Sequence, residues 1–245
     1  MKFHQIIPID VGTFTALPKQ TCMYRMHREV TYEAPCIMWY IKGTADNIIV
    51  DLGPPEPAQC IENHGLVIRR SADQEPINAL QAHGLSPDDV NTVVLTHLHW
   101  DHSFGFHLFK NARFLIQRKE VEYAIAPLPC HHSLYYEKNM GRPPFVDFLE
   151  RTELVDGDCE IEDGVNAVFL PSHSPGFQGV SIRTEKGIYF IAGDAVGLFE
   201  CWEAVPHIPS GIFNNLEQYY ESMKKISGFV LPGHDARVFD KGIYP

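Results

Sequence analysis

The stretch THLHWDH, residues 96–102, places three histidines and an aspartate within seven positions. Its first residue, Thr96, ends the apolar run NTVVLT (91–96), which is typical of a strand buried on both faces. In an extended segment, residues i and i+2 point to the same side, so His97 and His99 can bind one metal ion together. A bend after His99 would turn the last two polar residues of the motif toward a second position. The pattern therefore favours a metal site over a solvent-exposed, histidine-rich loop.

Further candidate ligands stand where later apolar strands meet loops. A catalytic metal ion usually takes three protein ligands and water, so four motif side chains are too few for two ions. His173 follows NAVFLPS, Asp194 follows GIYFIAG and His234 follows GFVLPG. Strand ends are where open α/β sheets place their sites. The candidate metal ligands are therefore His97, His99, Asp101, His102, His173, Asp194 and His234.

Strand-like runs occur in two groups along the chain, and each group is accompanied by segments with helical spacing. The expected strands are 3–12, 36–43, 47–53, 91–96 and 112–117 in the first group, and 166–172, 178–184, 187–194 and 227–235 in the second. The expected helices are 75–84, 118–126 and 214–226. This order fits an α/β domain, spanning residues 1–245, in which two sheets pack face to face with helices outside.

Two segments, 20–35 and 127–146, look like insertions rich in aromatic residues, histidine and proline. Long irregular segments in a compact domain are commonly lids or binding loops. The three aromatic residues beside the motif have two interpretations. They form either an apolar wall for a substrate or core packing beneath the site: Trp100, Phe104 and Phe106.

The composition is that of an ordinary globular protein of 245 residues, with 44% hydrophobic residues and a formal net charge of −11. The acidic balance disfavours nucleic acid and anionic membranes as partners. The N-terminal sequence MKFHQIIPIDVG reads as a strand and not as a signal peptide, and no apolar run approaches a membrane span, so we expect a cytoplasmic protein. The six irregularly spaced cysteines are then expected to be reduced.

Four further segments, taken together with HLHWDH, resemble the motifs of the metallo-β-lactamase superfamily in their order and spacing. They are NIIVDLG (47–53), SHSPG (172–176), AGDA (192–195) and GHD (233–235). The resemblance spans most of the chain. It implies a four-layer αβ/βα sandwich with a dinuclear metal site at one edge, between the two sheets.

The resemblance also implies a role for each candidate ligand. One ion would take His97, His99 and His173, and the other would take Asp101, His102 and His234. Asp194 would bridge the two ions. Asp51, in the strand of 47–53, would orient a ligand without binding metal. Other histidines lack motif support. Among them, His4, His64 and His83 are expected at the surface, and His107, His131, His132 and His207 are weaker candidates for positions near the site.

Within the superfamily, the chain is most similar to the quorum-quenching N-acyl homoserine lactonase group, whose members have a similar length and end in GHD with a short tail. Zinc β-lactamases generally carry cysteine where Asp194 stands. Glyoxalase II adds a C-terminal helical domain for glutathione, whereas this chain ends eleven residues after His234. The segment 20–35 resembles loops that take part in lactonase dimers, so a homodimer is a further expectation.

Two positions depart from the lactonase pattern. Gly197 stands where these lactonases commonly have a tyrosine that contacts the substrate, and Phe177 stands where many have histidine. Neither change removes a metal ligand, but the first leaves the exact substrate open. Three tyrosines are candidates for a replacement hydroxyl: Tyr24, Tyr135 and Tyr136.

The implied activity is hydrolysis of a small lactone, an N-acyl homoserine lactone or a related cyclic ester, by a hydroxide that bridges two divalent ions. Zinc is the expected metal, and iron, manganese and cobalt also suit such ligands. Asp101 or Asp194 would carry the proton. The alternatives are a glyoxalase II-like thioesterase or another hydrolase of a small ester or cyclic amide. A flavodiiron-like redox protein would need a flavin domain, and a degenerate binding scaffold would be expected to have lost ligands.

Overall fold

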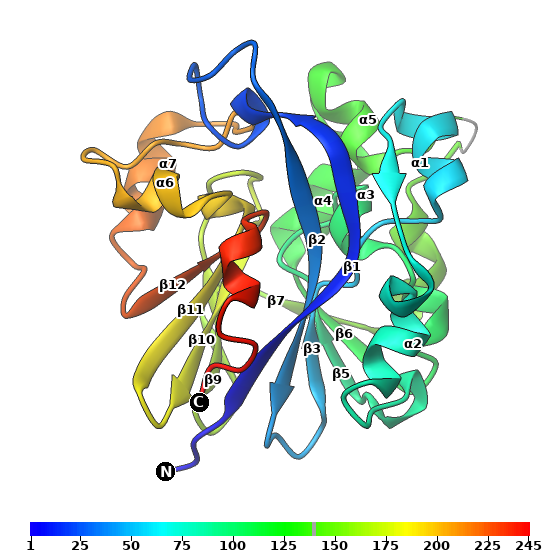
Figure 1. Cartoon of the computed structure of the whole chain (residues 1–245), viewed down its shortest axis with the longest axis vertical. Coiled ribbons are helices and arrows are strands. Elements are labelled where there is room, and N and C mark those ends of the chain that lie inside the picture. The colour runs from blue at the N-terminus through cyan, green and yellow to red at the C-terminus, as the bar shows by residue number, and fades with distance from the viewer. Residues whose placement is uncertain (139–140) are drawn as a thin grey trace.

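The computed structural model describes residues 1–138 and 141–245. Residues 139–140, which belong to the predicted insertion 127–146, lie outside the described residues. The chain forms two β-sheets that pack face to face, with helices on the outer side of each sheet (Figure 1). The predicted αβ/βα sandwich is confirmed by this arrangement.

The first sheet is mixed, and its parallel part carries the motif strand. Its order is β4 (Ile68–Arg69), β1 (Gln5–Pro18), β2 (Thr31–Lys42), β3 (Ile48–Val50), β5 (Thr92–Val94), β6 (Arg113–Gln117) and β7 (Thr152–Val155). The neighbouring strands β3, β5, β6 and β7 run parallel to one another. The pairs β4–β1, β1–β2 and β2–β3 are antiparallel. The β2–β3 pair is the hairpin expected from the sequence.

The second sheet supplies the later candidate ligands. Its order is β12 (Phe229–Pro232), β11 (Gly187–Gly193), β10 (Gln178–Thr184), β9 (Val165–Phe169) and β8 (Cys159–Glu162). All neighbours pair antiparallel except β11 and β12, which are parallel. Because β11 and β12 run in the same direction, the residues that follow them emerge at one edge of the sheet.

Alternate residues of β2 face two different cores. Ile37, Trp39 and Ile41 pack between the sheets, against residues of β10 and β11. Met38 and Tyr40 point to the other side, into the core beneath the helices. β5 is likewise buried on both faces, as its apolar run predicts, because Val94 faces the first core and Val93 the second. Full burial of one such aliphatic side chain contributes ~1.5–3 kcal/mol.

The helices divide between the two outer faces, as Figure 1 shows. Those over the first sheet are α1 (Pro57–His64), α2 (Pro76–Gln81), α3 (Trp100–Ser103), α4 (Arg118–Ile125) and α5 (His132–Tyr135). Those beside the second sheet are α6 (Phe199–Glu203) and α7 (Leu216–Met223). α2 begins at Pro76, whose fixed φ suits a first helical turn. No helix among the described residues is long and apolar enough to cross a membrane.

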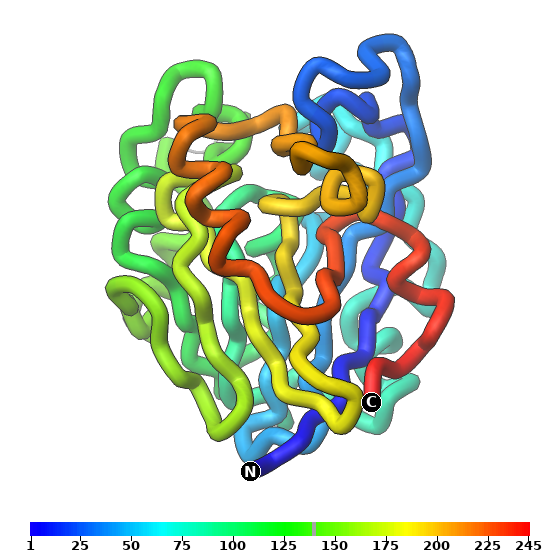
Figure 2. The backbone as a smooth tube through the Cα atoms, turned by 90° about the vertical axis from the view of Figure 1, so that its left-hand side faces the viewer, coloured from blue at the N-terminus to red at the C-terminus, as the bar shows by residue number. Residues whose placement is uncertain are grey.

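The insertion expected at 20–35 is partly wrong. Its last five residues, 31–35, belong to β2, because β1 continues past Gly12 and pairs with β2 as far as Pro18–Thr31. The register shifts after Asp10, and Gly12 has a φ of 141°, so the strand bends there without ending. The two termini lie at the end of the molecule opposite the 20–30 loop (Figure 2) and are joined through an antiparallel bridge between Ile6 and Tyr244.

Candidate metal centre

The motif residues follow β5 in two local conformations. The chain is extended through His97 and His99, whose ring centroids lie 4.3 Å apart. The short helix α3 then begins at Trp100 and carries Asp101 and His102. The bend expected after His99 is therefore present, and it divides the motif into two pairs of side chains.

The later strands bring their polar residues to the same place. His173 follows β9, Asp194 follows β11 and His234 follows β12. The candidate ligand atoms form three groups, and within each group they lie within 4.8 Å of one another. The groups are His97–His99–His173, Asp101–His102–His234 and His97–His102–Asp194. All seven sequence-predicted residues thus meet in one cluster.

Asp194 lies between the first two of these groups. Its Oδ1 atom is 3.3 Å from Nε2 of His102 and 3.2 Å from Nε2 of His234. Its Oδ2 atom is 3.5 Å from Nε2 of His173. One carboxylate oxygen therefore faces each group, which is the arrangement that a bridging carboxylate requires.

Several polar atoms of the cluster lack a partner. Nε2 of His97, Nε2 of His102 and Oδ1 of Asp194 are buried and have no hydrogen-bond partner within residues 1–138 and 141–245. Leaving such an atom unsatisfied costs about 1–3 kcal/mol, so buried polar atoms normally have partners. Divalent cations held by these residues would supply the missing partners. Imidazole nitrogen and carboxylate oxygen together suit zinc, iron, manganese or cobalt, so the donor set fits a metal centre.

Four of the histidine rings are fixed through their Nδ1 atoms, which leaves Nε2 directed into the cluster. Such contacts set the tautomer and the orientation of a ligand. The distances are 3.0 Å from His97 to Thr96 Oγ1, 2.9 Å from His102 to Asp51 Oδ2, 3.0 Å from His173 to Ser210 Oγ and 2.9 Å from His234 to Pro35 O. Of the four partners, only Asp51 was expected from the sequence.

Asp51 joins two parts of the site. Its Oδ1 accepts the backbone N–H of Thr96 at 2.8 Å, and its Oδ2 accepts the hydroxyl of Thr96 at 2.8 Å. The same Oδ2 contacts His102. Asp51 has a φ of 57°, an uncommon conformation for a residue other than glycine. The three contacts hold it there, so the backbone entry to the motif and one ligand ring depend on one carboxylate.

Glu120 is a buried carboxylate that sequence reasoning missed. It lies on α4, yet it is fully buried and accepts hydrogen bonds from loops on both sides of the cluster. Its Oε1 accepts the backbone N–H of Leu98 at 3.0 Å, and its Oε2 accepts the Ser174 hydroxyl at 2.6 Å and the Gly176 N–H at 3.2 Å. A Cβ at position 176 would lie 2.0 Å from the Glu120 nitrogen, so only glycine fits. Glu120 therefore clamps the His97–His99 segment to the His173 loop.

Tyr135 completes the Glu120 clamp and does not supply a substrate-facing hydroxyl. Its hydroxyl donates to Glu120 Oε1 at 2.9 Å, and its ring packs edge-on against His99 with centroids 4.7 Å apart. The Tyr136 hydroxyl donates to a backbone carbonyl, and the Tyr24 ring packs on Phe213. None of these three tyrosines is among the described residues that line the cavity over the cluster.

In the metal-free cluster, burial and neighbouring charges shift the pKa values of the histidines in two opposite directions. Burial, reinforced by neighbouring imidazoles, lowers the pKa of His97 and His99 well below the usual value. Burial also lowers the pKa of His173, to about 4. Burial opposes protonation of His102 too, but the carboxylates around it, Asp194 foremost, raise its pKa well above the usual value. The neutral rings are ready to act as metal ligands.

The other histidines lie outside the cluster. The expectation of a surface position is wrong for His4, which is buried and bonds to the Asp163 carbonyl through Nε2 at 2.8 Å, and for the half-buried His64, which stacks on Trp100 at 4.0 Å. His83 is exposed, as expected. The described groups of possible metal ligands do not include the weaker candidates His107, His131, His132 and His207.

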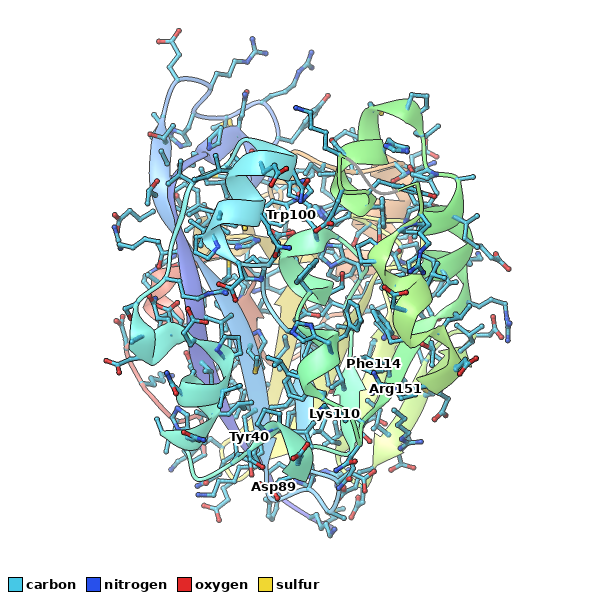
Figure 3. All side chains as sticks on the ribbon, turned by 90° about the vertical axis from the view of Figure 1, so that its right-hand side faces the viewer. Tyr40, Asp89, Trp100, Lys110, Phe114 and Arg151 are labelled. Atoms are coloured by element: carbon cyan, nitrogen blue, oxygen red, sulfur yellow. The ribbon has the colours of Figure 1, made fainter. Side chains whose placement is uncertain are left out.

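A narrow cavity of about 70 Å³ lies against the cluster. Leu17, Leu66, Leu134 and Ile212 give it apolar walls, and Trp100 lines it at the end of the molecule that carries α1 (Figure 3). Of the two interpretations of the aromatic residues beside the motif, the apolar wall of the site therefore holds for Trp100. It is wrong for Phe106, which packs on Phe148 with centroids 4.7 Å apart, and for Phe104, which lines a different cavity.

Comparisons with known proteins agree with this geometry. The family described as the metallo-beta-lactamase superfamily matches residues 32–242. The N-acyl homoserine lactonase AiiA of Bacillus thuringiensis subsp. kurstaki is 30% identical over 203 residues, which cover 77% of this chain and 76% of AiiA.

Solved structures share the fold. An N-acyl homoserine lactone hydrolase with the product N-hexanoyl-L-homoserine bound at its catalytic metal centre superposes with a TM-score of 0.79 at 24% identity, over 98% of this chain and 97% of the other. AidC, a dizinc quorum-quenching lactonase, gives a TM-score of 0.69 at 14% identity, over 96% and 90%. The chain therefore belongs to the metallo-β-lactamase superfamily and, within it, is related to the N-acyl homoserine lactonases.

Proposed function

We propose that the protein is a metal-dependent hydrolase that opens a small lactone at the seven-residue cluster. The observation that carries this proposal is the position of Asp194, whose two oxygens face the two ligand groups while buried nitrogens beside it lack partners. The relatives named as N-acyl homoserine lactonases support the choice of substrate class. The net charge of −11 makes a nucleic acid substrate unfavourable.

The ligand assignment follows the groups of facing atoms. His97, His99 and His173 would hold one divalent ion. Asp101, His102 and His234 would hold a second. Asp194 would contact both, and zinc is the metal we expect, with iron, manganese and cobalt as further candidates.

When bound, divalent ions supply a lowered pKa of water and a Lewis acid for the substrate carbonyl. The protein's own side chains position the reacting groups and transfer the proton. Asp101 and Asp194 are the carboxylates at the centre, and the side chains of both are largely buried, so either can take the proton of the attacking water and return it to the leaving alkoxide. Apolar walls around the cluster exclude bulk water from the reacting carbonyl.

A substrate panel tests this proposal. Zinc-, manganese- and cobalt-loaded protein would be assayed with homoserine lactones, simple γ- and δ-lactones, glutathione thioesters and linear esters of matched size. We expect lactones to give the highest kcat/KM. Greater activity on thioesters would favour a thioesterase instead, and no activity on any lactone would refute the proposal. The Asp194→Asn variant serves as the negative control.

A further inference from the structure

The cavity against the metal cluster is smaller than an ordinary ligand site. Its volume is about 70 Å³, whereas pockets for drug-sized ligands usually hold about 300–1,000 Å³. One wall comes from the segment after β1, where Thr21 and Cys22 face His173, Asp194 and other cluster residues across the cavity. Thr21 and Cys22 therefore bound the space directly beside the cluster.

Cys22 is fixed from several sides. It is 4% exposed, and its backbone carbonyl accepts the thiol of Cys201 at 3.2 Å. Behind it lies Gly197, where a Cβ would be 2.8 Å from the Cβ of Cys22 and 3.1 Å from its sulfur. Cys22 therefore occupies the space that a side chain at position 197 would need. The Gly197 carbonyl in turn accepts the backbone N–H of His234 at 2.9 Å, which places this packing beside a cluster ligand.

Tyr32 stands behind Cys22 and borders a second cavity. The Tyr32 hydroxyl and the Cys22 sulfur are 3.1 Å apart. The second cavity, lined by Tyr32, has a volume of about 450 Å³, and His234 lines both cavities. Cys22 lines only the small one and Tyr32 only the large one. The contacting pair is thus a partition between the small cavity and the larger one, while His234 borders both.

We propose that the Cys22–Tyr32 partition sets the substrate range of the site. It restricts the enzyme to small lactones whose ring carries a short apolar substituent, and it excludes long acyl chains. This inference rests on the proposed lactone hydrolysis. The apolar walls of the small cavity suit a short hydrocarbon group, and the Cys22 side chain occupies the space into which a longer chain would extend.

The test is a chain-length profile. The kcat and KM of the metal-loaded enzyme would be measured for N-butanoyl, N-hexanoyl, N-octanoyl and N-decanoyl homoserine lactone. For the wild-type protein, we expect kcat/KM to fall by at least about tenfold from the shortest to the longest chain, the discrimination that misfitting methylene groups can give. In Cys22→Ala, the KM for the decanoyl substrate should fall by about tenfold, while values for the butanoyl substrate change little.

Two further variants distinguish an effect of cavity size on the substrate range from a general loss of folding or activity. Cys60→Ala is the matched control, because Cys60 is also buried and its thiol bonds to a backbone carbonyl, but it does not line either cavity. Its profile should stay that of the wild type. Tyr32→Ala opens the partition from the other side and keeps the test decisive if Cys22→Ala fails to fold.

The outcomes are distinct. The size limit is overturned if kcat/KM of the wild-type protein does not change with acyl chain length. It is also overturned if Cys22→Ala and Tyr32→Ala both keep the wild-type dependence on chain length. Either result leaves the proposed lactone hydrolysis intact. An equal loss of kcat for every chain length in those variants, without a change in KM, shows general damage and also overturns the size limit. Absence of activity on every lactone by metal-loaded protein overturns the proposed function, and this inference with it.

Discussion

Asp51 Oδ2 lies 2.9 Å from Nδ1 of His102, while Nε2 of the same ring faces Asp194 at 3.3 Å. The ring is thus held between a carboxylate that orients it and a carboxylate of the cluster. Such an outer partner fixes the tautomer and raises the basicity of a ligand. The arrangement makes Asp51 a positioning residue for the site, although it contributes no atom to the ligand groups.

Replacing Asp51 should therefore weaken metal binding without removing a ligand. In Asp51→Asn, one side-chain oxygen becomes an amide nitrogen, so the contacts to Thr96 and His102 cannot all be kept. We expect a loss of roughly 10–100-fold in metal affinity, measured by competition with a chromophoric chelator. Asp156→Asn, at an exposed position paired with Arg118, is the control. Equal affinities in both variants would show that Asp51 does not position His102.

Glu120→Gln should loosen two ligand loops at once. The amide nitrogen cannot accept a hydrogen bond, so Leu98 or the pair Ser174 and Gly176 loses its acceptor. We expect a loss of about 1–3 kcal/mol in the free energy of unfolding, measured by denaturant titration, together with weaker metal binding. Glu122→Gln, on the exposed face of the same helix, should change neither quantity.

A purely structural role for Glu120 would give a different result. The metal-loaded Glu120→Gln protein would then bind cobalt with wild-type affinity and give the wild-type visible spectrum, and only the stability would fall. We expect instead an altered spectrum, because the His97–His99 segment and the His173 loop both change position when the clamp is lost.

The metal-free protein should lose stability in mild acid through His173. Burial lowers its pKa to about 4, whereas a histidine in an unfolded chain titrates near 6.5. Between these values the unfolded chain binds a proton at His173 that the folded chain does not, so the contribution of His173 to stability is complete above pH 6.5 and falls by about 1.4 kcal/mol per pH unit down to about pH 4. Denaturant titrations of metal-free wild type and His173→Asn across this window measure the effect. Parallel pH dependences in the two proteins would contradict it.

Much of the site was accessible from the sequence because its ligands follow apolar strands. His173, Asp194 and His234 each stand at the end of a run with strand character, and the parallel pairing of β11 and β12 brings the last two to one edge. The motif itself changes from an extended segment to a helix at Trp100. Local patterns therefore predicted both the two-sheet fold and the cluster. Cytoplasmic location, dimer formation and the identity of the metal stay predictions.

The features of the fold and the site that the sequence did not predict depend on contacts between segments far apart in the chain. Glu120 lies in the segment RKEVEYAI, where an acidic residue reads as solvent-exposed, and its burial arises only when two loops close over α4. The contact of Gly197 with Cys22 joins residues far apart in the chain. β1 was expected to end at Gly12, but the partner strand β2 keeps it extended through the bulge to Pro18. No local pattern reports such pairings.

The number of divalent ions per chain tests the central claim most directly. The protein would be loaded with zinc, freed of excess metal and analysed by plasma mass spectrometry, alongside Asp194→Asn and His99→Ala. We expect two ions in the wild type, fewer in both variants with unchanged circular dichroism, and lactone hydrolysis that stops on chelation and returns with metal. A wild-type protein that binds no metal, or that hydrolyses lactones equally well after chelation, would contradict a dinuclear hydrolase.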